Sequence, residues 1–283
     1  MTYRSFINHW TEILQAAQVD SPRLSVEVLL CHCAQLNSAG LIIRMQDELP
    51  EAVRVQVEPL LQRRVQGEPV AYLCGCKEFY GYDFTVTPDV LIPRPETEHI
   101  IELVEERYAS NSTFTFADFG TGSGILPVTL CLVFSKATGR AFDISRDALA
   151  VASGNAQRHS VSDRIQFVRG DMQSVLLQPA SVDLVVSNPP YVTLQEYADA
   201  SHEVTAYEPQ LALTSGEDGL DLIREFIPQA GACLKSGGWF FMEFGWQQGA
   251  AILNLALESG LFEECFIQKD LAGHDRILAA KRK

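Results

Sequence analysis

The chain has 283 residues, more than a typical single domain holds, and its 47% hydrophobic content can fill a sizeable core. A formal net charge of −14 argues against a broad surface for nucleic acid, which needs lysine and arginine opposite the phosphates. We find neither an apolar run of the roughly 18 residues that cross a bilayer nor a signal-peptide core, so we expect a cytoplasmic protein that does not contact a membrane.

The first 75 residues show the periodicity of helices. Apolar residues recur at helical spacing from Phe6 to Ala17, and further helices are predicted over residues 22–35 and 50–65, with Pro59 as a kink or break. Such stripes are typical of a helical core rather than of a cofactor site. We predict a helical domain over residues 1–75 that recognises a protein substrate, followed by a hairpin or linker over residues 76–93.

The cysteines do not indicate a metal site. The chain has seven of them, an odd number, and with no export signal we expect free thiols. The segments Cys31-His32-Cys33 and Cys74-Gly75-Cys76 have one-residue gaps that differ from the usual zinc spacing, and no matching histidine pair follows. We therefore predict no bound metal.

The remaining chain, residues 94–283, alternates short apolar runs with helical patterns. After a helix that begins near Pro95, this alternation predicts an α/β domain with a seven-stranded, mostly parallel, doubly wound sheet. The last two strands are joined by a short loop and should pair antiparallel. The predicted strands cover residues 114–118, 139–143, 164–168, 182–187, 238–244, 262–268 and 276–281, and the helices cover residues 124–135, 145–159, 217–234 and 247–259.

A glycine-rich loop follows the first strand of this sheet. It reads Gly120-Thr121-Gly122-Ser123-Gly124, which differs from the G-x-G-x-x-G of a dinucleotide site. Its glycines permit a tight turn and let a ligand approach the backbone and the N-terminus of the next helix. Ligands of such sheets bind at the carboxyl ends of the strands, so the loop is a candidate ligand site, although turns of this kind also occur for packing alone.

Acidic residues follow the next two strands. Asp143 ends the second strand, where a carboxylate can accept hydrogen bonds from both hydroxyls of a ribose. The alternative is that Asp143 caps the following helix, although Ser145 is also placed to do so. After the third strand, Asp171 can accept a hydrogen bond from an adenine amino group, and the thioether of Met172 can lie against its ring.

The fourth strand ends in Asn188-Pro189-Pro190-Tyr191. Two prolines stop the strand ladder, which leaves the carbonyls of Asn188 and Pro189 without partners in the sheet. The Asn188 side-chain oxygen and a rigid carbonyl form a pair of acceptors for a planar NH2 group, and Tyr191 adds a flat face. In isolation a simple turn explains the tetrapeptide equally well, but with the three preceding strand ends it indicates a methyltransferase that acts on an amino group.

Taken together, these motifs resemble the release factor glutamine methyltransferases. The resemblance covers nearly the whole chain. It rests on Gly67-Glu68-Pro69 with Tyr72, Glu78-Phe79-Tyr80-Gly81, Leu91-Ile92-Pro93-Arg94-Pro95-Glu96-Thr97-Glu98, Gly120 to Gly124, Asp143-Ile144-Ser145, Asn188 to Tyr191, Glu208-Pro209, Gly216 to Asp221 and Asp270 to Arg276.

The resemblance implies transfer of a methyl group from S-adenosylmethionine to the N5 amide of a glutamine in class I peptide-chain release factors. It places the donor at Gly120 to Gly124, Asp143, Met172 and Asn188, and the glutamine at Asn188 to Tyr191. It also implies that Phe79 and Arg94 help to close the pocket. At position 172 relatives often have a bulkier aromatic residue.

Two other functions are open on this sequence. An adenine-N6 methyltransferase can hold an exocyclic amine with the same tetrapeptide once the base is flipped out, but the negative charge and the lack of a basic insertion disfavour it. A non-catalytic donor-binding protein can have the same fold, but the intact tetrapeptide disfavours that.

Overall fold

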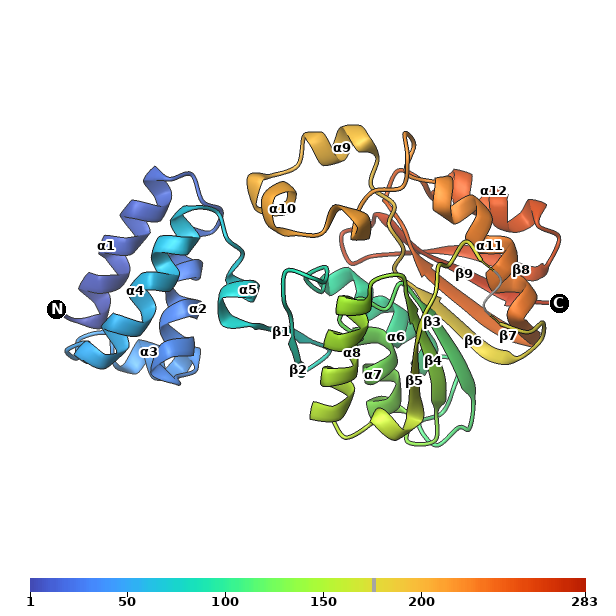
Figure 1. The fold of residues 1–283 in the computed structure, drawn as a ribbon, viewed down its shortest axis with the longest axis horizontal. Coiled ribbons are helices and arrows are strands. Elements are labelled where there is room, and N and C mark those ends of the chain that lie inside the picture. Colours follow the sequence, from blue (N-terminus) through green and yellow to red (C-terminus); the bar gives the residue numbers. More distant parts are fainter. Residues whose placement is uncertain (175–176) are drawn as a thin grey trace. The chain divides into compact units, whose positions relative to one another are not determined.

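The computed structural model describes residues 1–174 and 177–283 and divides into two compact units. The first unit comprises Met1–Cys76 together with Ser201–Tyr207, and the second comprises Lys77–Ala200 and Glu208–Lys283 (Figure 1). No helix in the described ranges is both long and apolar enough to span a membrane. The seven cysteines, all within the described ranges, are free thiols.

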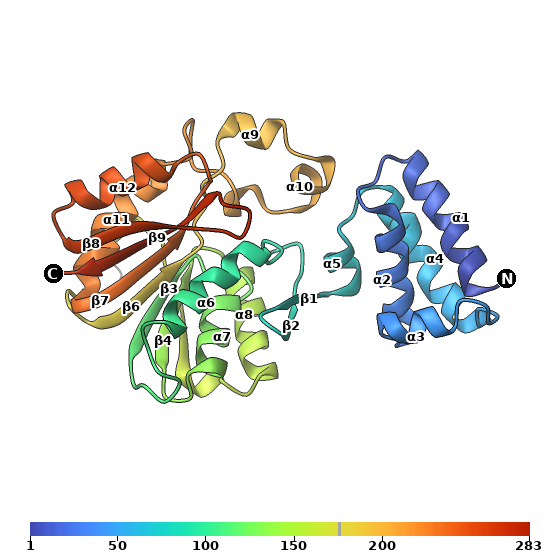
Figure 2. The ribbon, with the colours of Figure 1, turned by 180° about the vertical axis from the view of Figure 1, so that it is seen from behind.

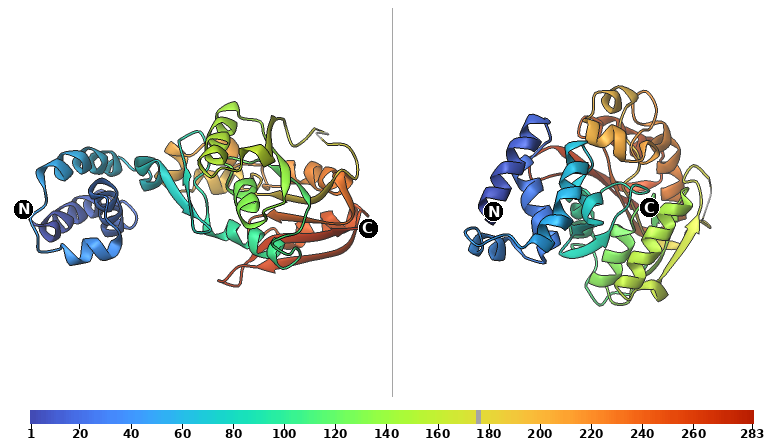
Figure 3. Two further views of the ribbon diagram at one scale, coloured as in Figure 1. Left: turned by 90° about the horizontal axis from the view of Figure 1, so that it is seen from below. Right: turned by 60° about the vertical axis from the view of Figure 1, so that its left-hand side comes forward.

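The first unit is a helical bundle with an apolar core of its own (Figure 3). Phe6, Ile7 and Leu14 lie on one face of the first helix and are fully buried, which explains why this amphipathic segment folds as a helix. The helices of the unit are α1 (Tyr3–Ala16), α2 (Pro22–Ala34), α3 (Ser38–Ile43), α4 (Glu51–Val65), α5 (Val70–Cys74) and α10 (His202–Tyr207).

Pro59 does not break α4, contrary to our expectation. The helix continues to Val65, and Val57 and Leu61, on either side of Pro59 in the sequence, are buried on the helix face that packs against the core. Proline removes the hydrogen bond to the carbonyl four residues earlier, at Val55. Because Pro59 and Val55 are both exposed, water can bind that carbonyl, and the buried residues hold the helix together.

The short helix α10 belongs to the first unit although it lies far along the chain. Arg64 is buried, and its guanidinium donates to a Glu203 carboxylate oxygen at 2.7 Å. The hydroxyl of Tyr207 donates to the carbonyl of Gln66 at 3.1 Å. These contacts join residues about 140 positions apart, and no local pattern in the sequence predicted them.

The second unit contains the predicted doubly wound sheet. Its strand order is β5-β4-β3-β6-β7-β9-β8 (Figure 2). Strand β9 runs opposite to the others and pairs antiparallel with both β7 and β8, as expected for the last two strands. The chain winds outward from β3 through β4 to β5 and then returns to β6, so the order reverses between β3 and β6. The strands are β3 (Thr115–Phe119), β4 (Thr138–Asp143), β5 (Ile165–Arg169), β6 (Val182–Ser187), β7 (Leu234–Glu243), β8 (Phe262–Lys269) and β9 (Asp275–Arg282).

Helices cover both faces of the sheet. Successive strand residues point to opposite faces, so Phe116 belongs to one apolar cluster and Ala117 to the other. The first cluster includes residues of α6 (Glu98–Glu105), α7 (Ile125–Val133) and α8 (Arg146–Arg158), and the second includes residues of α11 (Asp221–Cys233) and α12 (Gly249–Glu258). The unit also has β1 (Cys76–Phe79), β2 (Tyr82–Thr85), α9 (Leu194–Ala198), η1 (Pro95–Thr97), η2 (Ser162–Arg164) and η3 (Gln210–Ala212).

Candidate active site

A cavity of about 250 Å³ lies at the carboxyl ends of the strands where their order reverses. Its walls come from the loops after β3, β4, β5 and β6, which is where the sequence placed the candidate site. The predicted site residues among its lining are Gly120, Thr121, Gly122, Ser123, Asp143, Asp171, Met172, Asn188, Pro190 and Arg94. Gly124, Pro189, Tyr191 and Phe79 are not part of the lining.

The glycine loop has a backbone that favours glycine at three positions. Gly120, Gly122 and Gly124 have φ of 73°, 54° and 81°, a region where a Cβ atom is strained. A Cβ on Gly124 would lie 2.9 Å from that of Ala152 on α8, whereas one on Gly122 would meet nothing within 4 Å. Gly124 therefore serves close packing of α7 on α8, and Gly122 leaves space in the cavity.

Asp143 connects the glycine loop to the next helix. Its carboxylate accepts hydrogen bonds from the backbone N–H groups of Gly122 and Ser145, both at 2.9 Å. Burial raises the pKa of Asp143, and these backbone bonds oppose that rise. The N-cap of α8 is Ser145, whose side chain accepts from the Ala148 N–H, so the capping alternative for Asp143 does not hold.

Asp171 and Met172 follow β5 and both line the cavity. One Asp171 oxygen accepts from the backbone N–H of Gln173 at 3.0 Å, which fixes the turn that carries both side chains. Met172 is buried, and its Cε lies 3.3 Å from the place that a Cβ on Gly120 would occupy. The thioether thus lies against the glycine loop, and its contact with an adenine ring stays a prediction.

Within the described ranges, the tetrapeptide after β6 has three oxygens that accept no hydrogen bond: the carbonyls of Asn188 and Pro189 and the side-chain oxygen of Asn188. Among the described residues, no hydrogen bond reaches the carbonyls of Asn188 and Pro189, whereas the Tyr191 carbonyl accepts from Gln248 Nε2 at 2.9 Å. The Asn188 side chain donates through Nδ2 to the hydroxyl of Thr97 at 3.1 Å. Its Oδ1 has no partner among the described residues, so Asn188 can offer this oxygen at the cavity.

Tyr191 is hydrogen-bonded to a buried acidic residue. Its hydroxyl donates to Glu243 at 2.9 Å, and its N–H donates to the carbonyl of Leu213 at 3.1 Å. Burial raises the pKa of Tyr191 well above its ordinary value, and the nearby charge of Glu243 adds to the rise. Tyr191 is therefore a neutral, fixed group. Its role in orienting an amide plane stays a prediction.

The motif residues Arg94 and Phe79 occupy different environments. Arg94 lines the cavity and donates to Glu208 at 2.6 Å, while the other Glu208 oxygen accepts from the Ile92 N–H at 3.1 Å. Phe79 is 1% exposed and packs edge-on against Phe84 in the core. Arg94 therefore lies at the cavity as predicted. Phe79 packs in the apolar core and does not form part of the cavity wall.

Comparison with known proteins places the chain in a family. Its residues 5–75 match the model of the PrmC N-terminal domain, and residues 97–217 match that of the methyltransferase small domain. A release factor glutamine methyltransferase of Nitratidesulfovibrio vulgaris is 44% identical over 99% of this chain and 95% of its own length. One of Bacillus subtilis is 35% identical over 90% of each chain. The chain belongs to the release factor glutamine methyltransferase family.

Solved structures of other methyltransferases share the fold. The hMettl16 catalytic domain in complex with MAT2A 3′UTR hairpin 6 superposes with a TM-score of 0.59 and 17% identity, over 75% of this chain and 80% of that one. A methyltransferase from Pyrococcus furiosus gives a TM-score of 0.51 and 14% identity, over 78% of this chain and 96% of that one. At these identities the likeness concerns the fold alone.

The cavity fits the donor that this family's methyltransferase domain uses, S-adenosylmethionine. Gly122 leaves space for a ligand against the backbone, and the Asp143 carboxylate retains lone pairs for the hydroxyls of a ribose. The apolar side of Met172 suits the face of an adenine ring. These residues would hold the donor at the ends of β3, β4 and β5.

Three polar residues at the site had no role assigned from the sequence, although one of them, Thr97, lies in a quoted motif. Thr97, which lines the cavity, is hydrogen-bonded to Asn188, and Glu243 is hydrogen-bonded to Tyr191. Asp118 precedes Gly120 of the glycine loop by two positions. Asp118 is fully buried, and neither of its oxygens has a hydrogen-bond partner among the described residues. Burial raises its pKa to about 7; the neighbouring Thr121 side chain opposes the rise, and the nearby Asp143 adds to it. The sequence signal that could have identified Asp118 is an acidic residue near the end of a mostly apolar strand.

Asp118 makes the stability of the protein depend on pH. Its folded-state pKa of about 7 exceeds the ordinary 3.8, so the folded protein keeps a proton that the unfolded chain releases. The free energy of unfolding therefore falls as pH rises through this window. Asp118→Asn keeps the shape and removes the ionisation. We expect its melting temperature to rise relative to wild type as the pH goes from 5 to 8, measured by circular dichroism. A melting-temperature difference between variant and wild type that is the same at pH 5 and at pH 8 would contradict this.

Proposed function

We propose that this protein transfers a methyl group from S-adenosylmethionine to the N5 side-chain amide of a glutamine in class I peptide-chain release factors. The observation that carries the proposal is a pair of oxygens after β6, Asn188 Oδ1 and the Pro189 carbonyl, that accept no hydrogen bond from any residue the structure describes. Two acceptors on a rigid corner match the two hydrogens of a carboxamide NH2 group. The names of the relatives support glutamine as the residue that carries this group.

In the reaction these two oxygens would orient the amide nitrogen as well as bind it. An amide nitrogen is a weak nucleophile because its lone pair is shared with the carbonyl group. Acceptors on both of its hydrogens fix the direction of the nitrogen and stabilise the positive charge that develops on it as it attacks. The donor, when bound, supplies an activated methyl group. No strong base is required first, because the alkylated amide nitrogen loses its proton readily to water.

Residues 1–75 would serve recognition of the release factor. This segment contributes no residue to the lining of the cavity. Its helices carry exposed apolar side chains, including Leu24, Ile42 and Ile43, which are 60%, 67% and 80% exposed. Contiguous exposed apolar surface is typical of protein-binding sites, and these side chains are the candidates in this segment to contribute to one. The reaction would take place in the cytoplasm, where release factors act, and the charge of −14 disfavours a nucleic-acid substrate.

The proposal is tested by incubating the protein with labelled S-adenosylmethionine and purified class I release factors. We expect one labelled methyl group per release factor, assigned by fragmentation mass spectrometry to the amide of a glutamine. A release factor in which that glutamine is replaced by alanine is the matched control and should stay unlabelled. Label on adenines of duplex DNA in a parallel reaction, with none on the release factors, would overturn the proposal in favour of nucleic-acid methylation.

A further inference from the structure

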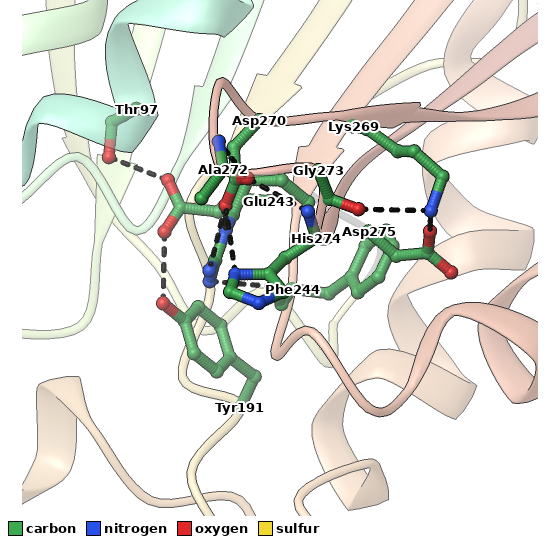
Figure 4. A network of polar contacts seen from close by, with 11 residues as sticks. Thr97, Tyr191, Glu243, Phe244, Lys269, Asp270, Ala272, Gly273, His274 and Asp275 are labelled. Atoms are coloured by element: carbon green, nitrogen blue, oxygen red, sulfur yellow. Dashed lines mark hydrogen bonds and ion pairs between the residues drawn. The ribbon is translucent and has the colours of Figure 1, made fainter.

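A buried carboxylate lies behind the corner that carries Asn188. Glu243, at the end of β7, is 1% exposed and accepts two hydroxyl hydrogens. Thr97 donates to Oε2 at 2.6 Å, and Tyr191 donates to Oε1 at 2.9 Å. Figure 4 shows both hydroxyls pointing at the two oxygens of this side chain.

The hydrogens of this network can be counted. A hydroxyl has one hydrogen, and Thr97 gives its hydrogen to Glu243. The Thr97 oxygen can then only accept, so the Asn188 atom that lies 3.1 Å from it must be the NH2 nitrogen. The other end of the amide, Oδ1, is consequently the end that remains for a substrate. A side-chain amide is nearly symmetric in shape, so without this constraint it can turn by 180°.

We propose that Thr97 and Glu243 are positioning residues, which fix the Asn188 amide so that its oxygen faces the amide of the substrate. The inference rests on the proposed function, since the orientation matters only if the substrate offers hydrogens. A reversed Asn188 would present an NH2 group to another NH2 group, and a hydrogen-bond acceptor would be lost where charge develops. Glu243 is linked to Asn188 through Thr97, and it accepts a hydrogen bond from Tyr191 directly.

The surroundings of Glu243 favour the accepting role. Burial raises its pKa and the charge of Glu96 adds to the rise, while the hydrogen bonds from Thr97 and Tyr191 and the charge of Arg276 oppose it. The guanidinium of Arg276 donates to Asp270 at 3.2 Å, and this bond fixes its position. The carboxylate therefore has two donors and a nearby positive charge, which are the partners that an ionised acid needs when it is buried.

The decisive variant is Thr97→Val, which keeps the shape of the side chain and removes the hydroxyl. We expect kcat for methylation of a release factor to fall about tenfold, with the Kd of the donor unchanged. Thr97→Ser should restore kcat to within about twofold of wild type. The matched control is Thr129→Val, because Thr129 is equally buried in α7 but its hydroxyl has no partner among the described residues. Its kcat should equal that of wild type.

A double-mutant cycle separates positioning from a purely structural role. If Thr97 acts through Asn188, Thr97→Val should cost nothing further in an Asn188→Ala background, whereas a structural effect would add to the loss. Additive losses, or a wild-type kcat in Thr97→Val, would overturn the inference while leaving the proposed function in place.

A measurement without substrate tests the same inference if the release factors prove not to be methylated. The side-chain NH2 resonance of Asn188 is identified in nuclear magnetic resonance spectra as the one that Asn188→Ala removes. We expect Thr97→Val to shift it strongly and Thr97→Ser to shift it little. An Asn188 resonance that does not respond to Thr97→Val would show that the two groups do not interact, and would overturn the inference.

Discussion

Replacing Asn188 by alanine should lower the turnover of the protein by on the order of a hundredfold or more. The side chain contributes Oδ1, which has no partner among the described residues and which, in the proposed mechanism, accepts a hydrogen bond from the incoming amide. Its loss removes a hydrogen bond that strengthens as charge develops on the nitrogen, so the effect should appear in kcat. The rate is measured by transfer of labelled methyl groups to a release factor.

The same variant should bind S-adenosylmethionine with nearly wild-type affinity in calorimetry. The glycine loop, Asp143 and Met172 are unaltered by it, and they account for most of the expected donor contacts. Turnover close to that of wild type would remove the proposed mechanism. A loss confined to donor affinity would instead reassign Asn188 to donor binding alone.

Gly122→Val should weaken donor binding about 10- to 100-fold. A Cβ at this position meets no protein atom within 4 Å, and Gly122 lines the cavity, so the added methyl groups would occupy space that the donor needs. Affinity is measured by calorimetry with S-adenosylmethionine or with its demethylated product, which avoids turnover.

Gly260→Val separates this clash from backbone strain. Gly260 has φ of 67° and also has no atom within 4 Å of an added Cβ, but it follows α12 and does not line the cavity. Valine at either position has the strain of a left-handed backbone, about 1–2 kcal/mol. We expect both variants to melt at lower temperature and Gly122→Val alone to lose donor affinity. Equal affinities would count against the placement of the donor over the loop.

The sheet was predictable from the sequence because its information is local. Buried parallel strands such as β3 and β6 are short apolar runs, and glycine, aspartate and proline mark their ends. Since the carboxyl ends of these strands meet at one edge, motifs far apart in the chain were expected at one site. The cavity lined by Gly122, Asp143 and Asn188 agrees with that expectation.

The support behind the site was not predictable in this way. Thr97 and Glu243 are 146 residues apart, and each is an ordinary residue in its own segment. Only the folded structure shows that Glu243, at the carboxyl end of β7, lies within hydrogen-bond distance of Thr97. The same holds for α10, which its short sequence does not assign to the first unit. Pairings of this kind depend on tertiary packing, which no periodicity encodes.

In the proposed mechanism, the corner after β6 holds a glutamine amide by two oxygens. A crystal structure of the protein with S-adenosylhomocysteine and a glutamine peptide from a release factor would show whether it does. We predict that the amide nitrogen lies about 2.7–3.2 Å from both Asn188 Oδ1 and the Pro189 carbonyl oxygen. A glutamine bound elsewhere, or an Asn188 that turns its NH2 group toward the peptide, would contradict the claim.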